Sequence, residues 1–499
     1  MTAKRNNWGG VLALGGILIL CLSVRPASGG EVEDRIRALE EVQRTNAAEL
    51  EKLKGEQVEL RKEATEAAAK LPDFSYRPGN GLNIEAADKS WGLRMSMQSQ
   101  FRMEFLSGRD EAGRTNGEIM ARRFRPSFLY CINNCLWEIE LQFDLDGFGT
   151  DSLFQRAEAY AHLEKLHPWL PTIGFGGDVS TTIGDARRGS SDTGSQAEYD
   201  LLSKNGFNTG SSGSGVTFTW DDRPLSGIGI PGRIRRFQIA TVNGVGKGAD
   251  NVQTNTDKRD TVVYLGVQPF SQMKNKWLRG FEFQMGAWFC GVDDRAEADQ
   301  GSCSRLRLRD HGDGGRQTLF DTGSDSIGRG TGTFLMPGVI WSVGPYTLRA
   351  AGGFQRFEDN GNRAATTGRK TGEMFLIGHD LYVWSPKGWL TGSSNTPGSV
   401  LLGTHFERND VECIGCPASI NGGQFHRNAV LLREWDIFYV LAPRMNVGAH
   451  FRWYDASNLR TNGALASQAA QNLGVCNNSC RPGRGGDWTD VVLSWRYTF

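Results

Sequence analysis

Long apolar runs are almost absent from this chain of 499 residues. Hydrophobic residues make up 39% of it and Gly occupies 64 positions, and the one unbroken apolar stretch, Val11–Val24, stands at the start. A soluble α/β enzyme of this size would normally show long apolar core segments, so the composition argues against that class.

The sequence also lacks the short motifs of common enzymes: a phosphate-cradling lysine loop, G-x-S-x-G and H-E-x-x-H. Its glycine clusters, GFGG and GTGTF, lie in strand-like or loop-like context, and its seven histidines are scattered. No catalytic residue, cofactor or metal is therefore predicted, and the inward His162 and His450 are assigned to the wall of a lumen. A barrel hydrolase is the alternative, because Ser and His could meet across strands.

The first 30 residues have the features of a secretory signal peptide. Lys4 and Arg5 precede the apolar stretch, and small residues follow at Ala27 and Gly29. We expect residues 1–29 to be removed, since the stretch is too short and wrongly flanked for a membrane span; a retained anchor is the alternative. Without Lys4, Arg5 and Arg25 the chain has 53 basic and 56 acidic residues, a net charge near −3, which gives no indication of nucleic acid.

Cysteine is scarce, and its spacing indicates disulfides. Eight cysteines follow the leader, mostly in close pairs, which in an exported protein are typical of disulfides. Zinc is the alternative for CIGC, although its surroundings do not resemble a zinc finger. The candidates are Cys131, Cys135, Cys290, Cys303, Cys413, Cys416, Cys476 and Cys480.

A helical period runs through residues 31–70. Eight of the eleven a and d positions between Val32 and Ala67 are apolar, and Gln43, Asn46 and Gln57 are the polar ones. This heptad pattern predicts a coiled coil in which the polar positions fix register and oligomer number. A lone solvated amphipathic helix is the alternative. Residues 71–88 are interpreted as a linker.

From residue 89 to the end the period changes to two. In residues 89–106, Trp91, Leu93 and Phe101 share one face, while charged and amide side chains occupy the other. Long strands with one apolar and one charged face favour a transmembrane barrel over a sandwich. Sixteen strands are predicted: 89–106, 117–131, 135–147, 152–164, 170–178, 214–222, 232–243, 258–267, 277–290, 330–343, 345–358, 369–386, 398–408, 427–441, 444–457 and 487–499.

The connections and the C-terminus fit this interpretation. Short turns alternate with long polar insertions, as in outer-membrane barrels, although the connection 386–397 is long enough to leave the count uncertain by two. In the terminal strand, Trp495, Tyr497 and Phe499 fall on one face. We expect this strand to close the barrel against the first strand, with its aromatic residues facing lipid. The fold class is thus mainly β: one antiparallel barrel of about 16 strands over 89–499, preceded by a helix.

The order of these parts resembles the phosphate-selective porin O/P family. The resemblance covers residues 32–499 in architecture, but its motifs cover only about 120–180 and the last strand. The chain departs from the family before the third loop, where the family's basic stretch is replaced by GGDVSTTIG (176–184). The resemblance implies a passive trimeric channel in a bacterial outer membrane, with the coiled coil in the periplasm. The C-terminal Phe499, with Tyr497 and Trp495 before it, also resembles the signal by which the barrel assembly machinery recognises outer-membrane proteins. The matching stretches are RRFRPSFLY (122–130), WEIELQFDLDG (137–147), FQRAEAYAHLEK (154–165) and PTIGFGGD (171–178).

The resemblance also implies inward arginines that bind small anions such as phosphate. Arg305, Arg307 and Arg309 lie in the insertion where the family's basic cluster would be. Inward acids, such as Glu138 and Glu158, leave open that the arginines merely pair with them in a general or carbohydrate porin. A structural tether to the cell wall is a third interpretation. The other predicted lining residues are Arg94, Arg102, Arg123, Arg125, Arg156, Arg236, Arg349, Arg452 and Arg496.

Overall fold

The computed structural model divides into two units, residues 1–71 and 72–499, which are described separately. It describes residues 29–77, 81–107, 116–143, 145, 154–180, 212–242, 260–292, 307–309, 318–321, 330–359, 369–414, 425–455 and 487–498. Residues 1–28 of the predicted leader (1–29) lie outside these ranges.

The first unit contains one helix, α1 (Gly29–Lys70). Good helix formers (Glu, Lys, Arg, Ala and Leu) fill most of it, and i,i+4 pairs such as Lys52–Glu56 support it. Its apolar seam is exposed along its length, at Leu39, Leu53 and Leu60 among others. No helix in the described ranges is long and apolar enough to cross a membrane.

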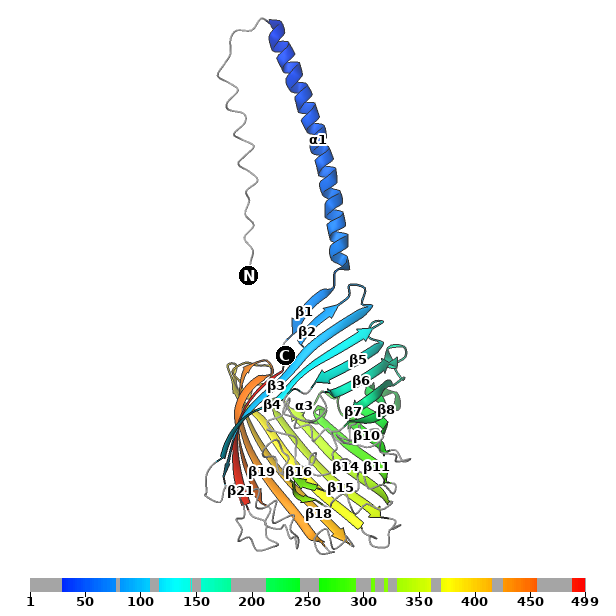
Figure 1. Cartoon of the computed structure of the whole chain (residues 1–499), viewed down its shortest axis with the longest axis vertical. Helices are drawn as coiled ribbons and strands as arrows, with labels where there is room; N and C mark the ends of the chain where they lie inside the picture. The colour runs from blue at the N-terminus through cyan, green and yellow to red at the C-terminus, as the bar shows by residue number, and fades with distance from the viewer. Residues whose placement is uncertain are drawn as a thin grey trace. The chain divides into compact units, whose positions relative to one another are not determined.

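The second unit is a closed antiparallel barrel of 16 strands, as predicted (Figure 1). Each strand pairs with the next along the chain, and β21 pairs with β3 to close the circle. The strands are β3 (Trp91–Ser107), β4 (Asn116–Ile132), β5 (Trp137–Phe143), β6 (Phe154–His162), β7 (Thr172–Ser180), β8 (Ser212–Pro224), β9 (Arg233–Val242), β10 (Asp260–Gln268), β11 (Phe281–Val292), β14 (Gly330–Val343), β15 (Tyr346–Asp359), β16 (Arg369–Ser385), β18 (Val400–Ile414), β19 (Phe425–Ala442), β20 (Met445–Asp455) and β21 (Asp487–Thr498).

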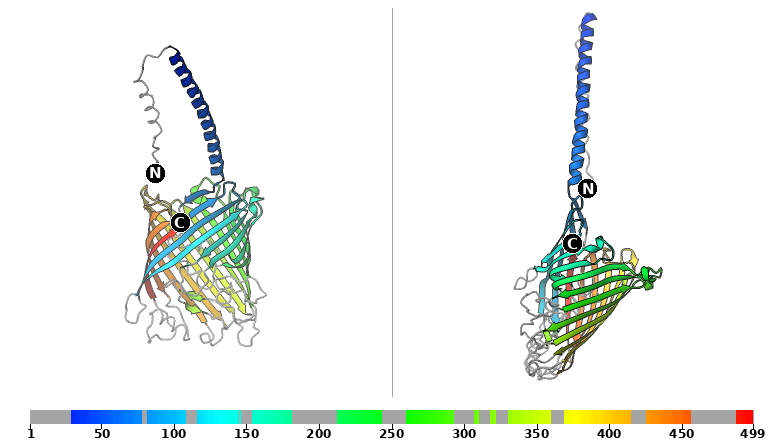
Figure 2. Two further views of the ribbon diagram at one scale, coloured as in Figure 1. Left: turned by 45° about the horizontal axis from the view of Figure 1, so that its top comes forward. Right: turned by 90° about the vertical axis from the view of Figure 1, so that its right-hand side faces the viewer.

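One end of the barrel carries the short turns, and the C-terminal end of β21 lies at that end (Figure 2). Gly344 and Arg444 turn with positive φ, and short helices, η1 (Leu163–Lys165), η3 (Ser226–Ile228) and α3 (Lys276–Arg279), occupy three longer turns. The doubtful connection after β16 contains only β17 (Gly388–Trp389), which folds back on β16. The count therefore remains sixteen.

The two faces of each strand differ in exposure as the alternation predicts. Along β19 the outward Trp435, Ile437 and Tyr439 are 44–48% exposed, whereas the inward Glu434 and Asp436 are at most 4% exposed. Because the exposed outward positions are mostly apolar, the outer face of the barrel suits a hydrocarbon environment.

Residues 71–88, interpreted from sequence as a linker, contain a hairpin. β1 (Asp73–Arg77) pairs with β2 (Gly81–Glu85), and β2 pairs with β3 at Gly92–Met95. β21 pairs with β3 only from Gln98 onward, so β2 occupies the edge that β21 leaves open. The Tyr76 and Tyr497 hydroxyls lie 3.3 Å apart and link the hairpin to β21.

Candidate functional site

The strands that close the barrel bring many polar side chains together on its inner wall. They come from β19, β20, β21, β3 and β4, and all are nearly completely buried. We call them the closure cluster: Gln100, Arg102, Glu104, Arg123, Glu434, Asp436, His450, Arg452, Asp490, Ser494 and Arg496. Its four arginines balance its four carboxylates.

Register explains these neighbours. His450 lies opposite Asp436 on β19, and Arg452 lies opposite Asp490 on β21. Across the closure, Ser494 on β21 lies opposite Arg102 on β3. Since side chains point inward at every second residue, these residues share one face.

Carboxylates contact the arginines of this cluster. Arg102 Nη1 lies 3.2 Å from Glu104 Oε1, and Arg452 lies 3.3 Å from Asp490 and 3.6 Å from Glu434. Buried charges persist when paired and hydrogen-bonded. The arrangement therefore supports the alternative in which wall arginines pair with inward acids.

Two predicted lining arginines farther around the wall are also paired. Arg236 binds both oxygens of Asp221, at 2.8 and 3.0 Å, and Arg349 binds Asp380. Arg94 is exposed near the short-turn end of β3, and Arg125 is half-buried opposite Gln98.

The remaining basic candidates cannot be placed by side chain. Arg307 and Arg309 belong to a short strand, β12 (Arg307–Arg309), of which only the backbone is described, and the same holds for Arg156 on β6. Arg305 lies outside the described residues.

His450 lies at the centre of a hydrogen-bond chain. Its Nδ1 is 2.6 Å from Asp436 Oδ1, and its Nε2 is 2.9 Å from Ser494 Oγ. Ser and His therefore meet across strands, in the order of a nucleophile, a base and an orienting carboxylate. However, Arg496 Nη2 also lies 3.1 Å from Nε2, so this nitrogen faces a guanidinium as well as the serine, and Ser494 is only 2% exposed. In this arrangement no substrate carbonyl reaches Ser494 Oγ.

The same residues offer a three-ligand set. Ligand atoms of Glu434, Asp436 and His450 lie within 4.8 Å of one another. The Arg452 and Arg496 guanidinium groups already place positive charge against this set. The donors therefore fit a hydrogen-bonded ionic network better than a metal centre.

Part of the inner wall is apolar, which corrects the expectation of a uniformly polar lumen. Inward Trp288, Phe334, Phe357 and Leu376, on β11 to β16, are at most 1% exposed. Their parity places these residues inside, so the error lay in expecting the inward side chains to be polar.

A hairpin approaches this region. β12 pairs with β13 (Thr318–Asp321), and both belong to the insertion between β11 and β14. β12 nevertheless lies near β18, which is separated from β11 in the sheet by β14, β15 and β16. On β18 the inward Glu407 and Val411 are buried, whereas the outward Leu402 is 42% exposed. The insertion between β11 and β14 therefore reaches as far as β18.

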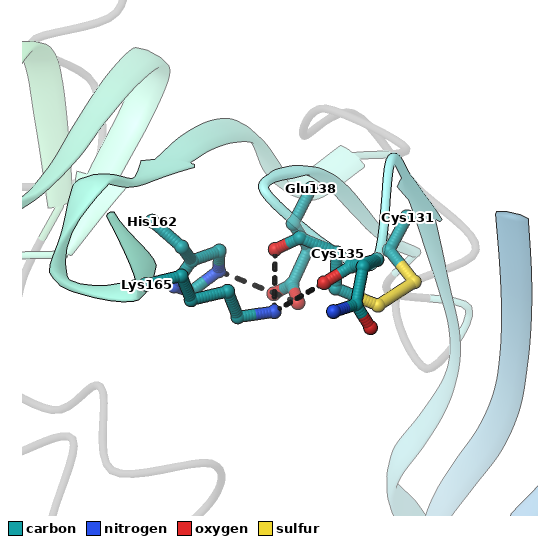
Figure 3. Close-up of a disulfide and its surroundings, with 6 residues drawn as sticks. Cys131, Cys135, Glu138, His162 and Lys165 are labelled. Atoms are coloured by element: carbon teal, nitrogen blue, oxygen red, sulfur yellow. Dashed lines mark hydrogen bonds and ion pairs between the residues drawn. A yellow bond between two sulfur atoms is a disulfide. The ribbon is translucent and has the colours of Figure 1, made fainter. Parts of the chain in front are cut away.

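One predicted disulfide closes the turn between β4 and β5 (Figure 3). Cys131 and Cys135 are bonded, and Lys165 Nζ donates to the carbonyls of Asn134 and Cys135 at 2.7 and 2.8 Å. His162 Nε2 lies 3.6 Å from Glu138 Oε2 on the adjacent strand. These contacts join the β4–β5 and β6–β7 turns.

Glu164 in η1 completes these contacts. Partial burial raises the pKa of its carboxyl, but hydrogen bonds with Thr172 and His162 outweigh this effect, so its pKa lies below the ordinary value. The carboxylate therefore stays charged beside His162.

Of the other cysteines, Cys290 is also disulfide-bonded, and the side chain of Cys413 is not described. The candidates outside the described residues are Cys303, Cys416, Cys476 and Cys480. At the C-terminus, Trp495 is exposed on the outer face with its ring centre 6.0 Å from that of Phe101, and Phe499 is not described.

Sequence reasoning identified His450 as inward but missed its partners. Asp436, Ser494 and Asp490 all have inward parity, which was the available signal. Parity does not give register, however, and register decides which inward groups face each other.

Comparisons with known proteins return likenesses in fold only. No family model matches the chain, and no curated protein matches its sequence. The outer-membrane protein OmpT of Vibrio cholerae, in trimer form, is similar with a TM-score of 0.49 and 10% identity over 82% of this chain and 100% of that chain.

Two further solved structures are similar at the same level. The outer-membrane channel DcaP of Acinetobacter baumannii gives a TM-score of 0.45 and 10% identity over 82% of this chain and 98% of that one. OmpF of Salmonella typhi, in complex with daunomycin, gives 0.45 and 11% identity over 86% of this chain and 100% of that one. These values assign no family.

Proposed function

We propose that this protein is an outer-membrane porin, a water-filled channel for passive diffusion of small hydrophilic solutes. The observation that carries the proposal is the closed barrel with an exposed apolar outer band and inward charged side chains. Sixteen strands are wide enough to enclose a channel. The likenesses to channel proteins are in keeping with it, as is the resemblance to the phosphate-selective porin O/P family.

We further propose that the solutes are small anions such as phosphate. The wall arginines Arg102, Arg236, Arg349 and Arg452 are paired with acids, so their charge is largely cancelled. Anion preference then depends on the β12–β13 insertion, where Arg305, Arg307 and Arg309 outnumber their two nearest acids, Asp310 next in sequence and Asp321 opposite Arg307. Guanidinium groups bind oxyanions bidentately and remain charged.

Planar-bilayer recordings test both levels of this proposal. Stepwise pores are expected from the purified protein, with a reversal potential in a chloride gradient that indicates anion preference and with phosphate blocking the chloride current. Replacing Arg305, Arg307 and Arg309 by Gln should reduce the preference, while the control Lys387→Gln, an exposed turn residue, should not. Cation preference in the wild type would refute anion selectivity, and absence of pores would refute the porin.

The proposed assembly is a homotrimer joined by a periplasmic coiled coil over residues 31–70. Exposed leucines along α1 support it, since a heptad seam is buried only by partner helices. Cross-linking of membranes, with and without residues 31–70, measures the oligomer. A species that remains monomeric with the helix present would contradict this assembly.

A tether is the second candidate, and the 42-residue length of α1 favours it. In that case the helix contacts the cell wall and the barrel is an anchor. Pull-down of the purified protein with sedimented peptidoglycan tests this function. Retention that disappears when residues 31–70 are deleted would support it, and no retention would exclude it.

A further inference from the structure

Charged side chains interrupt the outer face of the barrel on neighbouring strands. On β18 and β19, Arg408 and Arg433 are exposed and alternate with the buried inward residues Glu407 and Glu434, so both face outward. Each arginine follows a run of mostly apolar outward positions on the short-turn side of its strand, from Leu402 to Phe406 on β18 and from Leu441 to Trp435 on β19.

These arginines lie at the edge of the apolar band. The outward residues next to them are Phe375, Phe406 and Trp435, of which Phe375 and Trp435 are 48% exposed. A charged side chain facing lipid is costly at the midplane of a bilayer and nearly neutral at its interface. The position of the arginines therefore indicates the level of the outer headgroups.

Register makes the two arginines neighbours on the outer face. Arg408 lies opposite Leu431, and Arg433 lies opposite Phe406, so the arginines are diagonal neighbours on one face, roughly 7–8 Å apart at Cα. Arg408 uses Nε to contact Asp410, at 3.2 and 3.3 Å. The contact of Arg433 is an aromatic one: its Cζ lies 4.7 Å from the centre of the Trp453 ring.

We propose that Arg408, Arg433 and Trp453 form a binding surface for the phosphorylated headgroup of a glycolipid in the outer leaflet. Guanidinium groups on two adjacent strands suit the phosphates of such a headgroup, to which each can donate bidentate, charge-assisted hydrogen bonds. The indole ring offers an apolar face for a sugar, and the band below accommodates acyl chains. This proposal rests on the membrane location in the proposed function, but not on pore activity.

Thermal unfolding of the detergent-solubilised full chain tests the proposal. The probes are a bisphosphorylated lipid A, its dephosphorylated form and inorganic phosphate. Lipid A is expected to raise the unfolding temperature of the wild type. In R408Q/R433Q, the lipid A concentration that gives half of this temperature shift should rise about tenfold for each arginine replaced, since each replacement removes a charge-assisted hydrogen bond. Lys387→Gln, at the opposite end of the barrel, is the matched control and should behave as the wild type.

Three outcomes would overturn the proposal. The double variant could respond like the wild type, the dephosphorylated lipid could stabilise as well as lipid A, or inorganic phosphate alone could produce the arginine-dependent shift. The last result would assign the arginines to free phosphate. Conductance of R408Q/R433Q should equal that of the wild type because both residues face outward. Wild-type protein that binds lipid A but forms no pores would refute the porin and leave this proposal intact.

Discussion

Removal of Arg452 should destabilise the barrel strongly. Its guanidinium lies 3.3 Å from Asp490 and 3.6 Å from Glu434, and all three side chains are at most 1% exposed. Arg452→Met keeps much of the volume but leaves two carboxylates without this counter-charge. Breaking a buried ion pair from one side costs about 3–5 kcal/mol. Asp490→Asn should cost less, about 1.5–3 kcal/mol, because Arg452 keeps Glu434.

Urea unfolding in lipid vesicles, followed by tryptophan fluorescence, measures these effects. The double variant should be less destabilised than the sum of the singles, by about 0.5–3 kcal/mol, since the residues are in contact. Arg356→Met is the control, because Arg356 pairs with Glu358 at an exposed site and should cost about 0–1 kcal/mol. If Arg452→Met cost no more than Arg356→Met, the closure cluster would not be a paired ionic network.

Three further predictions concern other parts of the chain. Replacing Cys131 and Cys135 by Ser should lower the free energy of unfolding by about 2 kcal/mol, the loop entropy of so short a crosslink; reduction should destabilise the wild type at least as much, because Cys290 is disulfide-bonded too, and a larger loss in the variant would implicate the Lys165 contacts. A fluorophosphonate probe should not label folded protein because Ser494 is buried, and labelling that disappears in Ser494→Ala would instead indicate a hydrolase. Deleting residues 31–70 should leave single-channel conductance unchanged, and its loss from an assembled barrel would give α1 a role in the pore.

The strand positions were predictable because alternation is a local property. A strand that separates water from an apolar surface must change polarity at each residue, and this pattern located all sixteen strands, with the largest error, six residues, at the end of β18. β1 and β2 were not predicted, because strands of five residues beside Pro and Gly are too short to show a clear alternation.

The candidate site was less predictable because it depends on distant pairing. Nothing local indicates that Ser494 meets His450 or that Asp490 neutralises Arg452, since these residues come from separate strands whose register is set by the whole barrel. The apolar inward residues, such as Trp288, were not predicted for a related reason. The alternation of polar and apolar residues does not show which part of the barrel wall another segment of the chain will cover.

The shared edge of β3 has a practical consequence for handling this protein. β21 uses that edge up to Gln98 and β2 takes over at Met95, so only Ser96 and Met97 separate their partners. Any peptide fused after Phe499 that continued the strand would require the same backbone groups as β2. An affinity tag at the carboxyl end would thus compete with the N-terminal hairpin, whereas one inserted in a long connection would leave that edge undisturbed.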